Sequence, residues 1–182
     1  MKKILIIIII FLLTACSTTK NTPTSTVEAY ISRYQNLDSN VLKELDNSLA
    51  KEKNLSEDQK EIYKDLLEKQ YQNLSYKIKN EDVIADLATV SVEIEVLDYA
   101  TSISNSKKYF LEHTSDFIGK DENLSEENVD ENSAYIDYKL KKLKEVKDKT
   151  KYEITFELEK DNSYWKIKNL DEVDRRKIHG LY

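Results

Sequence analysis

Three stretches in the first half of the chain place apolar residues at the three- and four-residue spacing of an amphipathic helix. The first begins at Ser25-Thr26-Val27-Glu28, which has the spacing of an N-terminal capping box. The second is shorter and is marked by Leu42, Leu45 and Leu49. The third follows another capping box, Ser56-Glu57-Asp58-Gln59, and continues to Tyr71. We therefore expect three helices before the first strand.

The apolar spacing then changes to every second residue, which is the pattern of a half-buried strand. The alternation runs from Leu74 to Leu97, and we expect a turn within it at Asn80-Glu81-Asp82. The apolar phase slips by one residue at Leu87-Ala88, so we expect a β-bulge or bend there in a long, curved strand. The side chains expected on the buried face of this strand are Ala88, Val90, Val92, Ile94 and Val96.

A helical region is expected between these strands and the last ones. Apolar residues from Tyr99 to Phe117 fit one helix, and Ile136, Leu140 and Leu143 fit another. The stretch Asp121 to Glu131 lies between them and carries six acidic and only two apolar residues. Ordering a residue costs about 1 to 2 kcal/mol, which so little apolar surface does not offset. We expect this stretch to be exposed, and the segment from Gly119 to Ser133 that contains it to be mobile and dispensable for folding.

Alternation returns from Tyr152 to Leu158, and the run Tyr164 to Lys168 follows a turn, which predicts a closing hairpin. We expect Trp165 in this hairpin to face the same interior as the long strand. Residues 171–182 are polar and fit a short helix or a tail. The predicted fold class is α+β, with N-terminal helices packed on a curved antiparallel sheet and a helical insertion before the C-terminal hairpin.

The start of the chain has the features of an export signal. Two lysines precede an unbroken apolar run from Ile4 to Leu13, and Thr14-Ala15-Cys16 follows. The run has ten residues, whereas a membrane-spanning helix needs about 20. Leu13-Thr14-Ala15-Cys16 resembles the lipobox of bacterial lipoproteins, in which the cysteine thiol receives a diacylglyceryl group before cleavage. The resemblance implies that Cys16 is lipidated and becomes the mature N-terminus.

This resemblance divides the chain into three parts: a signal peptide at 1–15, a lipidated Cys16 with a polar tether at 16–25, and one domain at 26–182. Cys16 is the only cysteine, so an intramolecular disulfide and a Cys-ligated zinc site are excluded. Two acyl chains give stable attachment to a bilayer. We therefore expect the protein at the extracytoplasmic face of the cell membrane, held there by its lipid.

The charge of the exported part narrows the choice of partners. Without Lys2 and Lys3 the chain has 26 basic and 34 acidic residues, and 26 minus 34 gives a net charge of −8. Proteins that bind nucleic acid rely on basic surfaces that neutralise phosphates. We expect no nucleic-acid partner.

Two short motifs resemble those of NTF2-like domains, and most closely those of small bacterial NTF2-like lipoproteins. They are Asp86-Leu87-Ala88-Thr89-Val90 in the long strand and Trp165-Lys166-Ile167 in the last one. The resemblance covers residues 24–170, but the insertion at 119–149 is longer than the family pattern. It implies a fold in which helices cover the concave face of a curved sheet. The conical pocket of such domains binds small molecules, hosts catalysis in some members, or is filled.

No catalytic motif is present in the sequence. The two histidines, His113 and His179, are far apart and have no His-Glu-x-x-His context, which favours surface or helix-capping roles. A serine nucleophile elbow is absent, and two glycines cannot form a glycine-rich phosphate loop. We expect no cofactor, and we assign no catalytic residue.

Two acidic groupings have some features of sites for metal binding or acid–base chemistry. The stretch from Asp121 has oxygen ligands at calcium-loop offsets, but Glu126 replaces the glycine and Asn132 replaces the final glutamate. Glu93 and Glu95 lie two residues apart on the polar side of the long strand, where side chains are usually solvated. We expect no metal site.

Tyrosine is the most unusual feature of the composition, with twelve copies. Several lie on the expected apolar faces, where a ring can be buried while its hydroxyl reaches a polar partner. The residues expected to line a pocket are Tyr30, Tyr34, Tyr63, Tyr76 and Trp165. The alternative is ordinary core packing by the same rings.

These features lead to one functional hypothesis and two alternatives. The hypothesis is a non-enzymatic, lipid-anchored module that binds a small molecule, a peptide or another envelope component. One alternative is an NTF2-like enzyme, a hydrolase or isomerase, that uses a pocket tyrosine and a carboxylate. The other is a structural partner in an envelope complex, which would work through an exposed apolar patch.

Overall fold

The computed structural model describes residues 21–118 and 124–182. The expected signal peptide and Cys16 lie outside the described residues. The helices are α1 (Pro23–Gln35), α2 (Ser39–Leu49), α3 (Glu57–Asn73), α4 (Tyr99–Glu112), α5 (Thr114–Ile118), α6 (Ser133–Glu145) and α7 (Glu172–Ile178), with a short 3-10 helix, η1 (Val129–Glu131). The strands are β1 (Ser75–Ile84), β2 (Leu87–Leu97), β3 (Lys149–Asp161) and β4 (Tyr164–Ile167).

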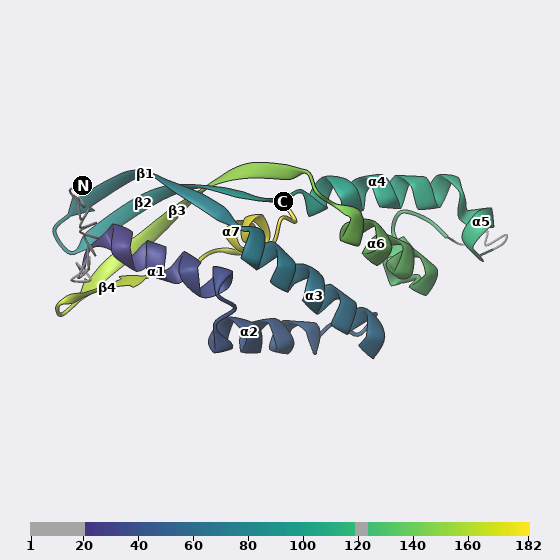
Figure 1. Cartoon of the computed structure of the whole chain (residues 1–182), viewed down its shortest axis with the longest axis horizontal. Helices are drawn as coiled ribbons and strands as arrows, with labels where there is room; N and C mark the ends of the chain where they lie inside the picture. Colours follow the sequence, from purple (N-terminus) through teal and green to yellow (C-terminus); the bar gives the residue numbers. More distant parts are fainter. Residues whose placement is uncertain (1–20, 119–123) are drawn as a thin grey trace, which may run out of the picture.

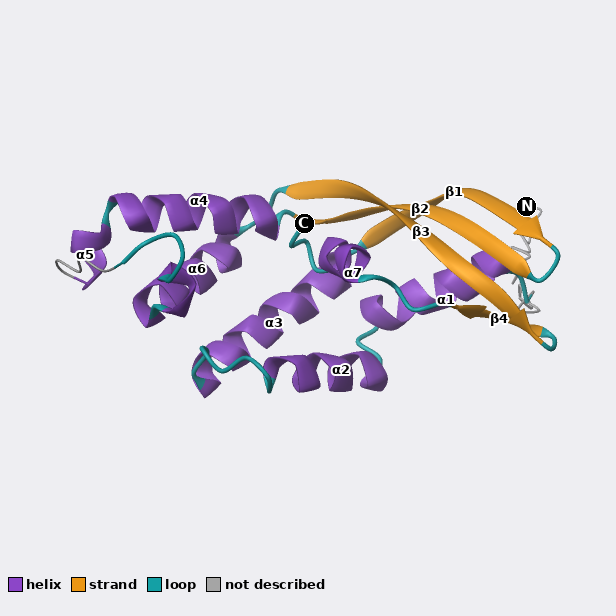
Figure 2. Ribbon diagram, turned by 180° about the vertical axis from the view of Figure 1, so that it is seen from behind, coloured by secondary structure: helices purple, strands orange, loops and turns teal. Residues whose placement is uncertain are grey.

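The fold is α+β, and its four strands form one antiparallel sheet in the order β1-β2-β3-β4. The molecule is elongated (Figure 1), and α1, α2 and α3 lie on one side of the sheet. Helices α4, α5 and α6 form an arm that projects beyond one end of the sheet, as the view from behind shows (Figure 2). The β1–β2 and β3–β4 turns lie at the opposite end.

Helix α1 begins earlier than the sequence predicted. Thr22 is its N-cap, and the Thr22 hydroxyl accepts a hydrogen bond from the Ser25 backbone N–H at 3.1 Å. Pro23 occupies the first helical turn, where its missing N–H costs nothing and its fixed φ suits the helix. The expected capping box at Ser25 and Glu28 is therefore wrong, and the last residues assigned to the tether belong to α1.

The predictions for α2 and α3 are confirmed. Ser56 caps α3, with its hydroxyl accepting from the Gln59 N–H at 3.2 Å while its own N–H donates to Gln59 Oε1 at 3.0 Å. Gln59 Nε2 also donates to Asp137 Oδ1 at 2.7 Å, which ties the start of α3 to α6. Gln59 therefore completes the capping box of α3 and also helps to position the arm relative to the helical layer.

The first hairpin differs from the expected one. β1 continues through residues 80–82, which pair with Ser91, Val90 and Thr89, and the turn lies at Ala85 and Asp86. The phase slip at Leu87-Ala88 is thus the beginning of β2 after the turn, and the irregularity of the ladder lies in β1 between Ile78 and Asn80. β1 is the edge strand of the sheet, and residues 80–82 are exposed. Their polar side chains therefore stay in contact with water while their backbone pairs with β2.

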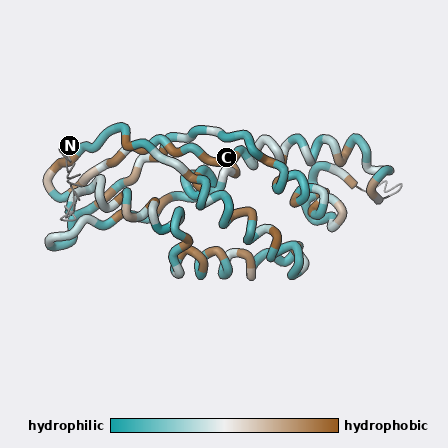
Figure 3. The backbone as a smooth tube through the Cα atoms, in the orientation of Figure 1, coloured by the Kyte–Doolittle hydropathy of each residue, from teal (hydrophilic) through white to brown (hydrophobic). Residues whose placement is uncertain are grey.

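The core forms between β2, β3 and the helices, as expected from the alternation. Val90 pairs with Phe156 and Val92 pairs with Ile154, and all four side chains are buried. The backbone coloured by hydropathy shows the corresponding alternation along the strands (Figure 3). The strong β-formers of β2 and β3 therefore supply one continuous apolar face for α1 and α3.

Trp165 lies on the same side of the sheet as Ile167 and contacts the core, but it is only partly buried. It pairs with Lys160 at the very end of the sheet, and the Lys160 ammonium lies 5.7 Å from the centre of its ring. The expectation that Trp165 faces the interior is thus confirmed for its direction, whereas its burial is incomplete because the hairpin extends past the helices.

The arm has a small core of its own. Phe110 of α4 and Tyr135 of α6 are buried, and their ring centres are 5.3 Å apart. Val129 is also fully buried against them, and Asp130 forms an ion pair with Lys107 at 2.8 Å. The expectation that this stretch is exposed is wrong at Val129, which is buried, and at Leu124, which packs partly buried against the same cluster. Residues 121–123 lie outside the described residues.

The end of the chain closes a junction between α3 and β2. Gln70 is buried, and its amide donates to the Leu97 carbonyl at 3.0 Å and accepts from the Leu97 N–H at 2.9 Å. Gly180 lies against this pair with a φ of +69°, and a Cβ there would overlap both the Gln70 amide and the Leu97 carbonyl. The segment after residue 171 is therefore part of the domain, with α7 as its helix.

Candidate functional site

A groove lined by tyrosines runs between the helices α1 and α2 and the segment from β4 to α7. It consists of two adjoining hollows of about 580 and 590 Å³. Both hollows are lined by Tyr34, Val41, Glu44 and Arg175, so they are two halves of one depression. We call this depression the tyrosine groove.

The first tyrosines of the groove come from successive turns of α1. Tyr30 and Tyr34 are four residues apart, which places them on one helical face. Their rings are 5.4 Å apart and their hydroxyl oxygens are 3.1 Å apart. Tyr30 also meets Phe156 of β3 edge-on at 5.7 Å. The floor of the groove is therefore held between α1 and the central sheet.

The row of rings continues into the second hollow. Tyr71 of α3 meets Tyr34 edge-on at 5.1 Å, and His179 lies 5.6 Å beyond Tyr71. The Tyr71 hydroxyl and His179 Nε2 are 3.1 Å apart and share a hydrogen bond. His179 is the C-cap residue of α7, so α3 and the last helix meet at this pair.

Burial keeps these groups neutral. It raises the pKa of Tyr34 and Tyr71 above the ordinary value, and neighbouring tyrosines add to the rise. Burial raises the pKa of Tyr63 to about 12, with a smaller contribution from Glu52. Burial and the nearby Arg175 lower the pKa of His179 to about 4. At neutral pH the floor is thus a row of uncharged hydroxyls and one neutral imidazole.

The rim of the groove is polarised in charge. Among the described residues, the hollow next to β4 has four cationic side chains, from Arg33, Lys166, Lys168 and Arg175. Glu44 is the one carboxylate that lines this hollow. The hollow next to α3 is lined by Glu44, Glu52 and Glu172 with Lys51 and Arg175. Three of these cations also have carboxylate partners outside the hollow: Arg33 pairs with Asp38, Lys166 with Asp161 and Lys168 with Glu157. The lining of this end nevertheless carries more cations than carboxylates.

Arg175 marks the boundary between the two hollows. Its guanidinium donates two hydrogen bonds to the Leu170 carbonyl, from Nε at 3.2 Å and Nη2 at 2.8 Å. This pairing fixes the planar group at the point where the polypeptide leaves β4 and enters α7. A fixed guanidinium is suited to hold a carboxylate or phosphate in one orientation.

The residues expected to line a pocket separate into two groups. Tyr30 lines the first hollow, Tyr63 lines the second, and Tyr34 lines both. Tyr76 and Trp165 contact the central core from β1 and β4, but they line neither hollow. Tyr76 lies on β1, which does not border the groove, and Trp165 lies on β4 just before Lys166 and Ile167, which do line it.

Sequence reasoning missed the contribution of the C-terminal segment. Arg175 and His179 reach the groove from α7, which the sequence left as a short helix or a tail. A signal was present, because Asp171 caps the helix, acids occupy its first turn and basic residues its last turn. That pattern predicts a helix, but its packing next to α2 and α3 depends on tertiary contacts.

Comparisons of the chain with protein-family models, with curated proteins and with solved structures find no match. The described residues contain no group of three or more His, Cys, Asp or Glu side chains that could hold a metal ion. Within the same ranges, none of the helices is long and apolar enough to span a membrane. The function is therefore inferred from the geometry of the groove.

The other candidates for chemistry lie away from the groove. Glu93 faces the open side of the sheet and pairs with Lys79 and Lys151, each at 3.1 Å. These lysines lower the pKa of Glu93, which stays ionised. Like His179, His113 is a helix C-cap, as expected, and its Nδ1 lies 2.9 Å from the Tyr109 carbonyl.

Proposed function

We propose that the protein is a lipid-anchored, NTF2-like module of the extracytoplasmic face that binds a small ligand in the tyrosine groove. The order of elements supports the NTF2-like assignment: three helices, a hairpin, a helical insertion and a closing hairpin on one antiparallel sheet. In the first motif, Ala88 and Val90 face the helices, and in the second Ile167 pairs with Leu158. The lipid anchor rests on the lipobox at Cys16.

The observation that carries the binding proposal is the combination of an uncharged aromatic floor with a polarised rim. An anionic group would lie at the end formed by Arg33, Lys168 and Arg175, and a cationic group would lie near Glu52 and Glu172. Between them, tyrosine hydroxyls offer hydrogen bonds and their rings offer apolar contact. A short peptide with free termini has this distribution of charge and the length to span both hollows.

The protonation of the floor favours binding over catalysis. A tyrosine that acts as a base or nucleophile needs a pKa lowered toward neutrality. The pKa values of Tyr34 and Tyr71 are raised instead, and the His179 imidazole is held neutral. These groups therefore give a ligand an uncharged floor and provide no activated base or nucleophile.

Binding is tested with tripeptides by titration calorimetry of the purified protein. We expect the tripeptide with a free carboxylate to bind more tightly than its C-terminal amide. Arg33→Gln combined with Lys168→Gln should weaken binding of the free acid by about tenfold, which corresponds to 1.4 kcal/mol. Lys142→Gln on α6 removes the same type of charge outside the groove and serves as the control. Equal affinity of acid and amide, or an unchanged affinity of the double variant, would contradict the proposal.

The anchor is tested separately by metabolic labelling with a fatty acid analogue. We expect the wild-type chain to take up the label and to sediment with membranes. Cys16→Ser should take up none and remain as precursor or as released material, because the acceptor thiol is gone. A serine variant that still carries the label would reject lipidation at this residue.

A further inference from the structure

Exposed apolar side chains gather at one end of the molecule, on the turns of the two hairpins. Of the seven large hydrophobic residues that are exposed among the described ones, four lie there. They are Val83, 47% exposed, Ile84, 78%, Leu87, 54%, and Tyr164, 70%. Soluble monomers rarely group such residues without an interaction partner. We call these four residues the hairpin tip.

The hairpin tip is apolar on both faces of the sheet. Ile84 pairs with Leu87, so these two side chains share the face opposite α1, α2 and α3. Val83 pairs with Ala88 and points to the helical side, as does the partly buried Trp165. The tip is therefore suited to enter an apolar layer end-on, and a partner that covered one face of the sheet would leave the apolar residues of the other face exposed.

The point where the described chain begins lies at this same end. The Trp165 N–H donates to Asn21 Oδ1 at 3.4 Å, and the Asn21 amide donates to the Ser163 carbonyl in the β3–β4 turn. The Thr24 hydroxyl and N–H both donate to Glu81 Oε2 in β1, at 2.6 and 2.8 Å. These contacts fasten the N-terminal side of α1 to both hairpins.

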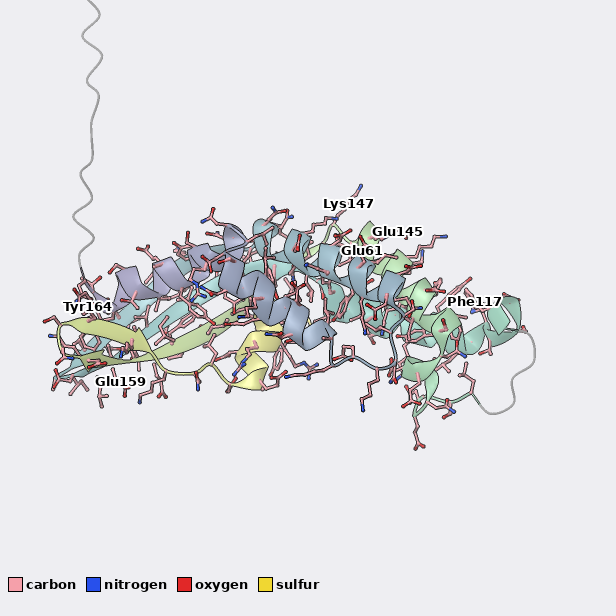
Figure 4. The ribbon with its side chains drawn as sticks, turned by 90° about the horizontal axis from the view of Figure 1, so that it is seen from below. Glu61, Phe117, Glu145, Lys147, Glu159 and Tyr164 are labelled. Atoms are coloured by element: carbon pink, nitrogen blue, oxygen red, sulfur yellow. The ribbon has the colours of Figure 1, made fainter. Side chains whose placement is uncertain are left out.

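The distance from Asn21 back to the lipidated residue is short. Cys16 is five residues before Asn21, and five residues span at most about 18 Å. On the proposed function, the hairpin tip is thus held within that distance of the bilayer by a covalent tether. The arm lies at the other end of the molecule, as the positions of Tyr164 and Phe117 show (Figure 4).

We propose that the hairpin tip inserts into the outer surface of the bilayer that holds the Cys16 lipid, and that this second contact sets the orientation of the domain. The inference rests on the lipid anchor in the proposed function. Tyrosine and tryptophan are favoured at membrane interfaces, where the ring is buried and the polar group stays in water. The arm would then point away from the membrane.

The contact is apolar and shallow. Asp82 and Asp86 flank the exposed residues of the β1–β2 turn, and carboxylates are not drawn into hydrocarbon or toward anionic headgroups. Lys160 and Lys166 of the second hairpin are balanced by Glu159 and Asp161. Binding through the tip should therefore occur on zwitterionic lipid and should change little with salt concentration.

The test places a fluorescent probe at the tip of the mature, lipidated protein in vesicles of phosphatidylcholine. Lipidation consumes the thiol of the only cysteine, so Ile84→Cys gives one free thiol for an environment-sensitive label. We expect doxyl-labelled lipid in the vesicles to quench most of the fluorescence of this label. The same label at Glu112→Cys, at the end of α4, should not be quenched.

A second set of variants asks whether the apolar side chains are responsible. With the label at Tyr164→Cys, the substitutions Ile84→Asp and Leu87→Asp should abolish quenching while the protein stays attached through its lipid. Val173→Asp also adds a charge at an exposed apolar residue, but on α7, and should leave quenching unchanged.

Three results would overturn the inference. The first is a label at residue 84 that stays unquenched in vesicles to which the protein is anchored. The second is burial of the label that occurs without vesicles and increases with protein concentration, which would show that the tip binds a second copy of the chain. The third is burial of the label in native envelopes but not in lipid vesicles, which would show that the tip binds a protein partner. Lipidation of the wild-type chain is measured first. If the chain carries no fatty acid, the lipid anchor in the proposed function is rejected, independently of the result for the hairpin tip.

Discussion

The protonation of His179, which lines the groove, is coupled to the stability of the domain. Its imidazole contacts the Tyr71 hydroxyl on one side and lies close to Arg175 on the other. Protonation would place a second positive charge beside the guanidinium in a partly closed site. The neutral form is therefore part of the native structure.

We predict that the free energy of unfolding decreases in mild acid because of this residue. The pKa of His179 is about 4 in the folded protein, against 6.5 in the unfolded chain, so the unfolded state takes up the proton first as the pH falls. The contribution is complete above about pH 6.5 and is lost progressively between about pH 6.5 and 4. At pH 5 the loss should amount to about 1 to 2 kcal/mol, since the ring is partly exposed to solvent.

Urea denaturation of the wild type and of His179→Gln at pH 7.5 and pH 5 measures this effect. Glutamine keeps a hydrogen-bonding group next to Tyr71 but does not titrate. Both proteins lose whatever stability the carboxylates contribute, so the difference between them isolates the histidine. An identical decrease in both proteins would contradict the prediction.

At the scale of secondary structure elements, the end of the acidic stretch is held by Val129. The 3-10 helix η1 places this side chain against Phe110 and Tyr135, while Glu126 and Glu127 remain exposed. The stretch thus joins the arm through the buried Val129, the partly buried Leu124 and one ion pair, whereas Glu126 and Glu127 face solvent.

We predict that Val129→Ala lowers the free energy of unfolding by about 1 to 3 kcal/mol, because it leaves a cavity in the core of the arm. Glu126→Ala combined with Glu127→Ala should stay within about 0.5 kcal/mol of the wild type, as exposed substitutions do. Chemical denaturation followed by the fluorescence of Trp165 and by circular dichroism gives both values. A loss at Val129 as small as that of the glutamates would show that the arm does not depend on this contact.

Periodicity predicted most of these elements because burial imposes it directly. The spacing of apolar residues predicted α2, α3, α6 and the alternating strands of the central sheet. It misplaced the first turn because β1 is an edge strand whose polar residues Asn80 to Asp82 pair without needing a buried face. It also missed the early start of α1, where Thr22 and Pro23 begin the helix without an apolar repeat.

The groove was predictable only in part. The spacing of Tyr30 and Tyr34 places both on one face of α1, and that face lines the groove. The pairing of Tyr71 with His179 joins residues more than a hundred positions apart, so no local pattern indicates it. The charge polarity of the rim likewise arises only when β4 and α7 are brought next to α1 and α2.

At the scale of the whole molecule, Gly180 joins the end of the chain to its middle. It lies against the hydrogen-bonded pair of Gln70 and Leu97, and its carbonyl accepts from the Ala100 N–H at 2.8 Å. Four parts of the structure therefore meet there: α3, the end of β2, the start of α4 and the segment after α7.

We predict that Gly180→Ala lowers the free energy of unfolding by about 2 to 4 kcal/mol. The methyl group adds strain at a positive φ and displaces the Gln70 amide from its buried partner. At about 2 to 4 °C per kcal/mol, the melting temperature should fall by roughly 4 to 16 °C. Differential scanning calorimetry measures the change.

Gly180→Asn separates the two causes. Asparagine tolerates a positive φ better than alanine, but it also carries a Cβ. A similar loss in both variants would assign the effect to the steric overlap, whereas a clearly smaller loss for asparagine would assign it to backbone strain. If the free energy of unfolding of Gly180→Ala lies within about 0.5 kcal/mol of the wild-type value, the prediction that this junction stabilises the domain is wrong.

The packing of α1 against β4 affects the order in which the protein is able to fold. These elements lie about 130 residues apart in the sequence, and Gly180 packs against the α3–β2 junction from the segment after α7. Contacts between segments so far apart in the sequence form only after a large loss of chain entropy. While it is being exported as we propose, the emerging polypeptide would have no complete core, and it would stay unfolded and able to pass through a narrow channel. Folding would then be completed on the far side of the membrane, after α7 has arrived.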